Sequence, residues 1–136
     1  MVDLLPRNPV LAVPPAPPHE ALEHFERSFR FETDCWDVHA ALASGDPGFV
    51  LLDVRSPEAF AAGHVPGAGN LPHARISDRL LAEHAADAVF VVYCAGPHCN
   101  GADRAAVRLA RLGRPVKKMV GGVEGWKDEG FALQSG

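Results

Sequence analysis

The sequence has few cysteines and no long hydrophobic segment. Among its 136 residues are only three cysteines, Cys35, Cys94 and Cys99, which are too few and odd in number for a disulfide framework. No apolar run approaches the length of a membrane span. The 13 Lys and Arg against 17 Asp and Glu give a formal net charge of −4, so no basic field favours nucleic acid or an anionic membrane as a partner. These absences predict a soluble, cytoplasmic protein in a reducing compartment.

The composition is that of one globular domain. Hydrophobic residues make up 47% of the chain and charged residues 22%, which excludes a wholly disordered chain, a collagen-like repeat and a coiled coil. A chain of this length buries roughly two thirds of the surface that it exposes when unfolded, so it can form a real core.

The amino-terminal part differs from the rest in composition. Residues 1–18 contain six prolines, which favour an extended arm and argue against a signal peptide. Residues 19–32 are predicted to form a helical extension, with a helix from His19 to Phe31. Its apolar side chains recur at helical spacing: Ala21, Leu22, Phe25 and Phe29. The helix could pack on the domain or form a homodimer with a second copy, and Phe29 and Phe31 could instead start an edge strand.

Residues 33–136 alternate between short apolar runs and amphipathic segments. The runs at residues 49–54 and 89–93 are typical of strands buried on both faces of a parallel sheet, and the run at 116–120 predicts a third strand. A helix is predicted to run to about Ala43, with Thr33 or Asp34 as its N-cap. Further helices are predicted over 58–62, over 76–86 with Leu80 and Leu81 inward, over 102–112 and around Trp126. This alternation predicts a parallel α/β domain over residues 33–136.

One loop lies between the second of these apolar runs and the 102–112 helix. Its residues are Cys94, Ala95, Gly96, Pro97, His98, Cys99, Asn100 and Gly101. Ligands bind at the carboxyl ends of strands in open α/β sheets, and Cys94 is placed at such an end. Its sulfur would face the amino terminus of the helix, where unpaired amides favour the thiolate. Gly96 and Gly101 would let the loop N–H groups form an anion nest. Cys94 is therefore a candidate nucleophile, or alternatively a small buried residue.

Several motifs resemble the rhodanese-like family, and they occur in the family's order. Residues 51–60 (LLDVRSPEAF) and 63–72 (GHVPGAGNLP) are similar to its amino-terminal signature. Cys94 matches its active cysteine, and residues 120–126 (VGGVEGW) match near its end. The resemblance covers about residues 33–133. It implies a rhodanese-like α/β fold, with a parallel five-stranded sheet flanked by helices on both faces, and sulfurtransferase activity.

The resemblance also implies a mechanism. Cys94 would take a sulfane sulfur from thiosulfate or a persulfide donor, become a persulfide, and pass the sulfur to a thiophilic acceptor. The loop N–H groups would stabilise the charged sulfur, so no metal and no organic cofactor is expected. The expected partners are a small-molecule sulfur donor and a thiol acceptor, with an acceptor protein as an alternative.

Four further residues are candidates for accessory roles. Asp53 and Arg55 match a structural pair of the family, and a catalytic role for Arg55 is the alternative. His98 could hold thiosulfate when protonated, or face solvent. Cys99 could attack the Cys94 persulfide, releasing sulfide and leaving a Cys94–Cys99 disulfide, or could pack within the loop.

Three more side chains are interpreted without a chemical role. His64 could be a base, but its setting favours a hydrogen-bonded loop residue. Cys35 is interpreted as structural, and Trp126 as part of the core. No metal site is predicted, because the potential ligands of the Cys94 loop have no second cluster to join.

The loop departs from the family pattern in length and in charge. Seven residues, Cys94 to Asn100, precede Gly101, whereas the common rhodanese loop has six and often an arginine at its far end. Related cell-cycle phosphatases have seven-residue loops closed by an arginine that binds phosphate. Asn100 holds that place here, although Arg104 could reach over. A phosphatase or arsenate reductase is therefore the less favoured alternative, and a non-catalytic sulfur-relay or protein-interaction module is the main one.

Overall fold

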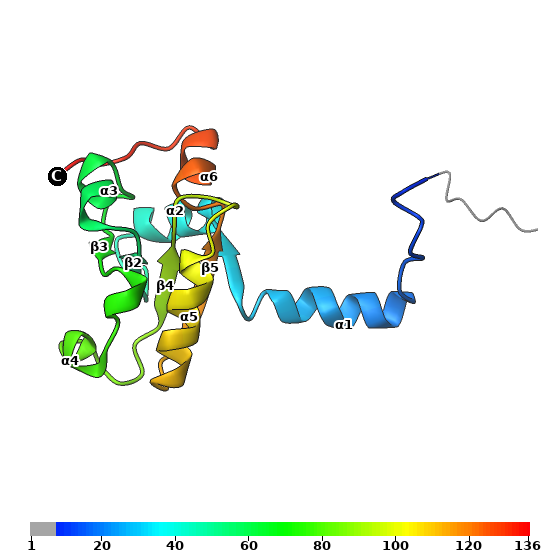
Figure 1. The fold of residues 1–136 in the computed structure, drawn as a ribbon, viewed down its shortest axis with the longest axis horizontal. Helices are drawn as coiled ribbons and strands as arrows, with labels where there is room; N and C mark the ends of the chain where they lie inside the picture. The colour runs from blue at the N-terminus through cyan, green and yellow to red at the C-terminus, as the bar shows by residue number, and fades with distance from the viewer. Residues whose placement is uncertain (1–7) are drawn as a thin grey trace, which may run out of the picture. The chain divides into compact units, whose positions relative to one another are not determined.

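The computed structural model describes residues 8–136, and its larger compact unit, Phe31–Gly136, is built around one sheet (Figure 1). All five strands are parallel, in the order β1-β5-β4-β2-β3. They are β1 (Glu32–Asp34), β2 (Val50–Asp53), β3 (Gly69–Asn70), β4 (Phe90–Tyr93) and β5 (Val116–Val120). The helices are α2 (Cys35–Ala43), α3 (Pro57–Ala62), α4 (Asp78–Leu81), α5 (Gly101–Arg111) and α6 (Gly122–Asp128), with a 3-10 turn η1 (His73–Arg75). The predicted parallel five-stranded sheet flanked by helices is confirmed.

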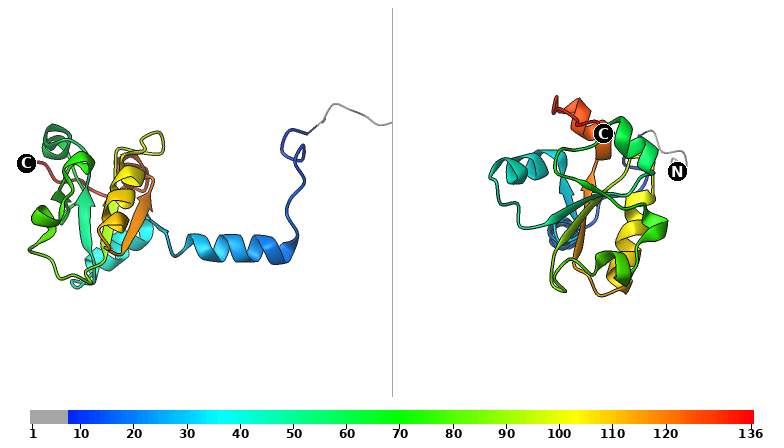
Figure 2. Two further views of the ribbon diagram at one scale, coloured as in Figure 1. Left: turned by 60° about the horizontal axis from the view of Figure 1, so that its bottom comes forward. Right: turned by 90° about the vertical axis from the view of Figure 1, so that its left-hand side faces the viewer.

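Helices lie on both faces of the sheet (Figure 2), and each face has a hydrophobic core. Alternate strand residues point to opposite faces, so each central strand supplies both cores. One core joins the sheet to α4 and α5 and contains Leu52, Val54, Phe90, Val92 and Cys94. The other joins it to α2 and α6 and contains Leu51, Val91, Tyr93 and Met119. This double burial explains why β2 and β4 are continuous apolar runs in the sequence.

The helix α5 follows its predicted amphipathic pattern. Its inward residues are buried: Ala102, Ala105 and Leu109. Its arginines are exposed: Arg104, Arg108 and Arg111. The helix ends before Gly113, whose φ of +77° is readily adopted by glycine. The helix starts at Gly101, one residue before its predicted start.

The predicted helix over 76–86 is wrong in extent. Only α4 is helical there, because the Ser77 side chain accepts a hydrogen bond from the Leu80 N–H and starts the helix at Asp78. Beyond Leu81, the Arg114 guanidinium donates hydrogen bonds to the carbonyls of Leu81 and Ala85, at 3.5 and 2.9 Å. Leu81 is fully buried as predicted, but Leu80 is 37% exposed rather than inward.

The strand β1 lies at the sheet edge, where the sequence analysis placed a helical extension up to residue 32. It pairs with β5, and Lys118 donates its backbone N–H to the Phe31 carbonyl at 2.9 Å. The larger unit therefore begins at Phe31, before the expected boundary at residue 33. Asp34 caps α2 by accepting from the Asp37 N–H at 2.8 Å, as one of the two predicted caps.

The amino-terminal unit contains one helix, α1 (Pro18–Ser28). It starts with proline in the first turn and ends before Phe29, short of the predicted end at Phe31. Residues 8–17, part of the proline-rich arm, contain no helix or strand, and residues 1–7 lie outside the described part of the chain. Leu22 and Phe25 of α1 and Phe29 just after it are exposed. A dimer contact through α1 stays a prediction.

None of the helices within residues 8–136 is both long enough and apolar enough to cross a membrane.

Candidate functional site

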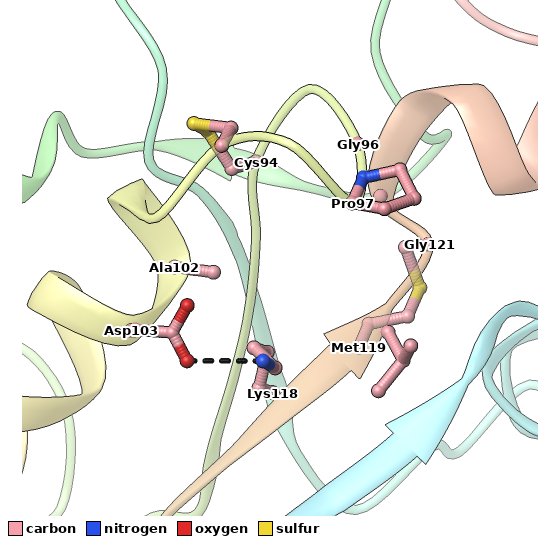
Figure 3. A pocket seen from close by; sticks show the side chains of 11 residues that line it. Cys94, Gly96, Pro97, Ala102, Asp103, Lys118, Met119 and Gly121 are labelled. Atoms are coloured by element: carbon pink, nitrogen blue, oxygen red, sulfur yellow. Dashed lines mark hydrogen bonds and ion pairs between the residues drawn. A yellow bond between two sulfur atoms is a disulfide. The ribbon is translucent and has the colours of Figure 1, made fainter. Parts of the chain in front are cut away.

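Cys94 lies where β4 ends and its loop begins, on the side of the sheet covered by α5 (Figure 3). The side chain is only 6% exposed. Its Sγ sits beside the start of α5: a Cβ added to Gly101 would lie 2.9 Å from it. The residue at that position must therefore be glycine or the sulfur must move. Cys94 therefore lies close to the amino terminus of this helix, as expected.

A tight turn brings the second cysteine of the loop back to the first. The Cys99 N–H donates to the Gly96 carbonyl at 3.1 Å, and Pro97 occupies the second position of this turn, which its fixed φ favours. Cys94 and Cys99 are joined by a disulfide, with their Cα atoms 6.3 Å apart. The Gly101 N–H points at the Cys99 Sγ at 3.4 Å.

The first turn of α6 holds the loop in place from the other side. Val123 and Glu124 donate their N–H groups to the carbonyls of Cys94 and Ala95, at 3.1 and 2.9 Å. Helix starts leave such N–H groups without partners inside the helix, so the loop completes α6 and α6 fixes the loop. This contact needs Gly122, whose φ is +58° and whose added Cβ would overlap the Cys94 carbonyl oxygen. The turn at Gly121 and Gly122 thus positions the cysteine.

Gly96 and Gly101 do not form the anion nest that was expected of them. A nest requires alternating right- and left-handed residues, and neither glycine has a positive φ. Their lack of a side chain matters instead for space. A Cβ on Gly96 would lie 3.2 Å from the Glu124 side chain, and one on Gly101 would crowd both sulfurs.

A hollow of about 160 Å³ opens beside the loop, between α5 and β5 (Figure 3). It is smaller than the sites that bind drug-sized ligands, so it suits a small molecule. Lys118 lines it. The Lys118 Nζ forms ion pairs with the carboxylates of Asp103, at 2.9 Å, and Glu32, at 3.6 Å. The hydrogen bond to Asp103 raises the pKa of Lys118. The lysine is therefore charged but neutralised by its neighbours.

A second hollow, of about 330 Å³, lies over α5 and η1 and is strongly basic. It is lined by His73 and by three arginines, Arg104, Arg108 and Arg111. His73 is next to the sulfur pair, since its Cδ2 lies 3.5 Å from a Cβ added to Gly101. The sequence analysis missed His73 as part of the site. The helical spacing of the three arginines can be seen in the sequence, but that they lie beside η1 depends on the fold.

Four further residues of the loop are exposed, and one of them, Pro97, also lines the hollow at Cys94. Ala95, Pro97, His98 and Asn100 are exposed, and His98 lines neither hollow. Asn100 accepts a hydrogen bond from the Arg104 Nε at 3.2 Å. Arg104 thus binds the residue at the closing position of the loop but lines the basic hollow, outside the hollow at Cys94. No cluster of three His, Cys, Asp or Glu side chains suited to a metal occurs in residues 8–136.

Asp53 and Arg55 form a buried ion pair away from the Cys94 side chain. Asp53 pairs in register with Tyr93, so its side chain lies on the face opposite Cys94. The Arg55 Nη2 donates to Asp53 at 2.6 Å and to the Gly63 carbonyl at 2.6 Å. Burial alone would lower the pKa of Arg55, but its hydrogen bonds and charge contact with Asp53 outweigh this and raise it. The pair ties β2 to the loop after α3, which supports the structural interpretation.

Three other interpretations agree with the geometry. His64 is buried, its Nδ1 is 2.8 Å from the Phe60 carbonyl, and its ring stacks on Phe60, as expected of a hydrogen-bonded loop residue. Cys35 is 4% exposed, and its S–H donates to the carbonyls of Val120 and Gly122 at 3.6 Å. Burial, with Asp34 nearby, raises the pKa of the Cys35 thiol to about 11. Trp126 is in the core and donates to the Ala132 carbonyl at 2.9 Å.

The fold and site together define an α/β domain with a buried cysteine at the carboxyl end of its central strand, beside the start of a helix. Comparison with known families identifies it further. The family model described as rhodanese-like domain matches residues 37–129, and the chain belongs to this family.

Relatives of known name fall into two kinds. A thiosulfate sulfurtransferase GlpE from Pseudomonas entomophila is 36% identical over 88 residues, which are 64% of this chain and 78% of that protein. An HTH-type transcriptional regulator, Rv0324 of Mycobacterium tuberculosis, is 45% identical over 87 residues. The chain matches only 38% of the regulator's length.

Solved structures share the fold over most of the chain. The BH2092 protein from Bacillus halodurans has a TM-score of 0.84 and 34% identity, covering 88% of this chain and 87% of that one. A thiosulfate sulfurtransferase from Pseudomonas aeruginosa has a TM-score of 0.68 and 24% identity, covering 86% of this chain and 21% of that one. The second similarity concerns the fold alone.

Proposed function

We propose that this protein is a sulfurtransferase that carries a sulfane sulfur as a persulfide on Cys94. The observation that carries the proposal is the position of Cys94 at the carboxyl end of β4, held by α6 and facing the start of α5. Membership in the rhodanese-like family and the GlpE relatives support it.

The reaction requires two displacements at sulfur. The Cys94 thiolate attacks the outer sulfur of thiosulfate, the S–S bond of thiosulfate breaks, and its electron pair leaves with sulfite. The resulting Cys94 persulfide then gives its outer sulfur to a thiophilic nucleophile, which regenerates the thiolate. The amino-terminal end of α5 favours negative charge on the sulfur in both steps.

Intact mass after incubation with thiosulfate tests the proposal. The reduced Cys99→Ser variant is expected to gain the mass of one sulfur, and addition of cyanide should remove this mass and form thiocyanate. The Cys94→Ser variant should show neither change. Absence of the adduct in Cys99→Ser would refute a Cys94 persulfide formed from thiosulfate.

The basic hollow favours an anionic acceptor. An acceptor approaching from α5 meets His73 and three arginines, so an anionic thiol, free or on an acidic protein, would be attracted. We therefore propose sulfur relay to such an acceptor as the second candidate function. Persulfidated Cys99→Ser should react faster with glutathione than with neutral 2-mercaptoethanol at low ionic strength, and Arg108→Glu should reduce this preference. An unchanged preference in Arg108→Glu would contradict it.

A further inference from the structure

The second cysteine of the loop has no part in the two displacements proposed above. Cys99 nevertheless lies within bonding reach of Cys94, and the loop is built to bring it there. The turn from Gly96 to Cys99, with Pro97 inside it, reverses the chain between the two cysteines.

The surroundings of the two sulfurs differ in a useful way. Cys94 is buried and fixed by α6, whereas Cys99 is half-buried. The Gly101 N–H points at the Cys99 Sγ, where it favours negative charge on that sulfur. Both sulfurs lie against the bare Cα of Gly101, since an added Cβ would be 2.9 Å from one and 3.3 Å from the other. The positions of both sulfurs are therefore fixed by their contacts.

We infer that Cys99 is a resolving residue that converts the Cys94 persulfide into sulfide and an internal disulfide. This inference rests on the proposed persulfide on Cys94. The Cys99 Sγ attacks the Cys94 Sγ and forms the bond that the structure contains. The bond from the Cys94 Sγ to the outer sulfur breaks, and its electron pair leaves with that sulfur. The proton of the Cys99 thiol balances the step, so the product is hydrosulfide.

The protein can complete a catalytic cycle only with an external thiol, because the disulfide must be reduced before the next turnover. Forming the disulfide reduces the outer sulfur to sulfide and oxidises the two cysteines. Two equivalents of a low-molecular-weight thiol, or one reduced dithiol protein, return the pair to the thiol state. The less buried Cys99 sulfur is the more accessible target for that thiol. Over a full cycle, thiosulfate and two thiols give sulfite, hydrosulfide and a disulfide.

A single turnover under anaerobic conditions, without reductant or acceptor, separates this inference from the proposed function. The reduced wild-type protein with thiosulfate should release one equivalent of sulfide and become 2 Da lighter, which is the mass of the two hydrogens lost on forming a disulfide. The Cys99→Ser variant should instead keep the added sulfur and release no sulfide. The Cys35→Ser variant should behave as wild type, and wild type without thiosulfate should not change.

The possible results have distinct meanings. A persulfide that persists in wild type, with no sulfide released, would overturn the resolving role and leave the proposed function standing. A persulfide mapped to Cys99 in wild type would also overturn it, since the sulfur would then have been relayed rather than released. No adduct in Cys99→Ser would refute the proposed function itself. With glutathione as reductant, we expect wild type to release sulfide at least about tenfold faster than Cys99→Ser, because the attack by Cys99 is intramolecular.

Discussion

Cys35 and Cys94 are both buried beside the start of a helix and beside the Gly121–Gly122 turn, yet their sulfurs have opposite surroundings. Burial, with Asp34 nearby, favours the neutral form of the Cys35 thiol and raises its pKa to about 11, and the thiol donates to two carbonyl oxygens. The Cys94 sulfur instead faces the start of α5 and a second cysteine. A helix amino terminus therefore does not activate a thiol by itself. The surroundings of the sulfur decide whether the thiolate or the thiol is favoured.

The largest expected difference between the two cysteines is in sulfur transfer. Cys94→Ser should lower thiocyanate formation from thiosulfate and cyanide by at least about a thousandfold, because the sulfur carrier is gone. Cys35→Ser keeps a donor for the two carbonyls and should stay within about twofold of wild type, since Cys35 does not contact the loop sulfurs. Comparable losses in both variants, with both folded by circular dichroism, would contradict the comparison.

The glycine turn between the two cysteines gives the next effect. Gly122→Ala places a Cβ on the Cys94 carbonyl and strains a φ of +58°, so we expect a loss of about 2–5 kcal/mol in the free energy of unfolding. Gly45 has a φ of +85° with no atom within 4 Å of an added Cβ. Gly45→Ala is therefore the control for strain alone, at about 1–2 kcal/mol. Urea unfolding measures both, and equal losses would show that the overlap with the loop is unimportant.

Two helical glycines test the sulfur environments separately. Gly101→Ala crowds the Cys94 and Cys99 sulfurs and should slow persulfide formation by roughly tenfold or more, because small displacements at a reacting centre are costly. Gly125→Ala brings a Cβ within 3.2 Å of the Cys35 Sγ and should leave that rate nearly unchanged. Stopped-flow or quenched mass measurements of adduct formation compare them. A slow Gly125→Ala variant would mean that crowding at Cys35 is transmitted to the loop.

The smallest effect is expected from pH. A native thiol pKa of about 11, above its ordinary value of 9.0, means that the folded state holds the Cys35 proton more tightly than the unfolded state. The stabilisation that this gives is complete below pH 9 and is lost as the pH rises from 9 through 11. Urea unfolding from pH 8 to pH 10 should show a smaller decline in Cys35→Ser than in wild type. The difference between the two proteins isolates Cys35 from Tyr93, whose pKa burial also raises.

Labelling gives the same test without unfolding. Iodoacetamide at pH 8 should modify the loop cysteines of the reduced native protein and spare Cys35, which reacts only after denaturation. Rapid modification of native Cys35 would contradict its structural role.

Local patterns predicted most of the fold because burial imposes them. The apolar runs at β2 and β4 and the amphipathic spacing of α5 follow directly from what each element must cover. The extents failed where a distant group intervened. Arg114 takes carbonyls that a longer α4 would have used, and β1 forms because β5 offers an edge to residues 32–34. Neither partner is near in the sequence.

For the site, the sequence by itself determined that a cysteine ends a buried strand before a helix, and that Cys99 lies five residues further on. Only the tertiary structure decided what surrounds them. The α6 amides that hold the loop, the bare Gly101 under both sulfurs, and the meeting of His73 with the arginines of α5 join segments far apart in the chain. The spacing of residues fixes contacts within one element, whereas contacts between elements depend on how the sheet stacks its helices.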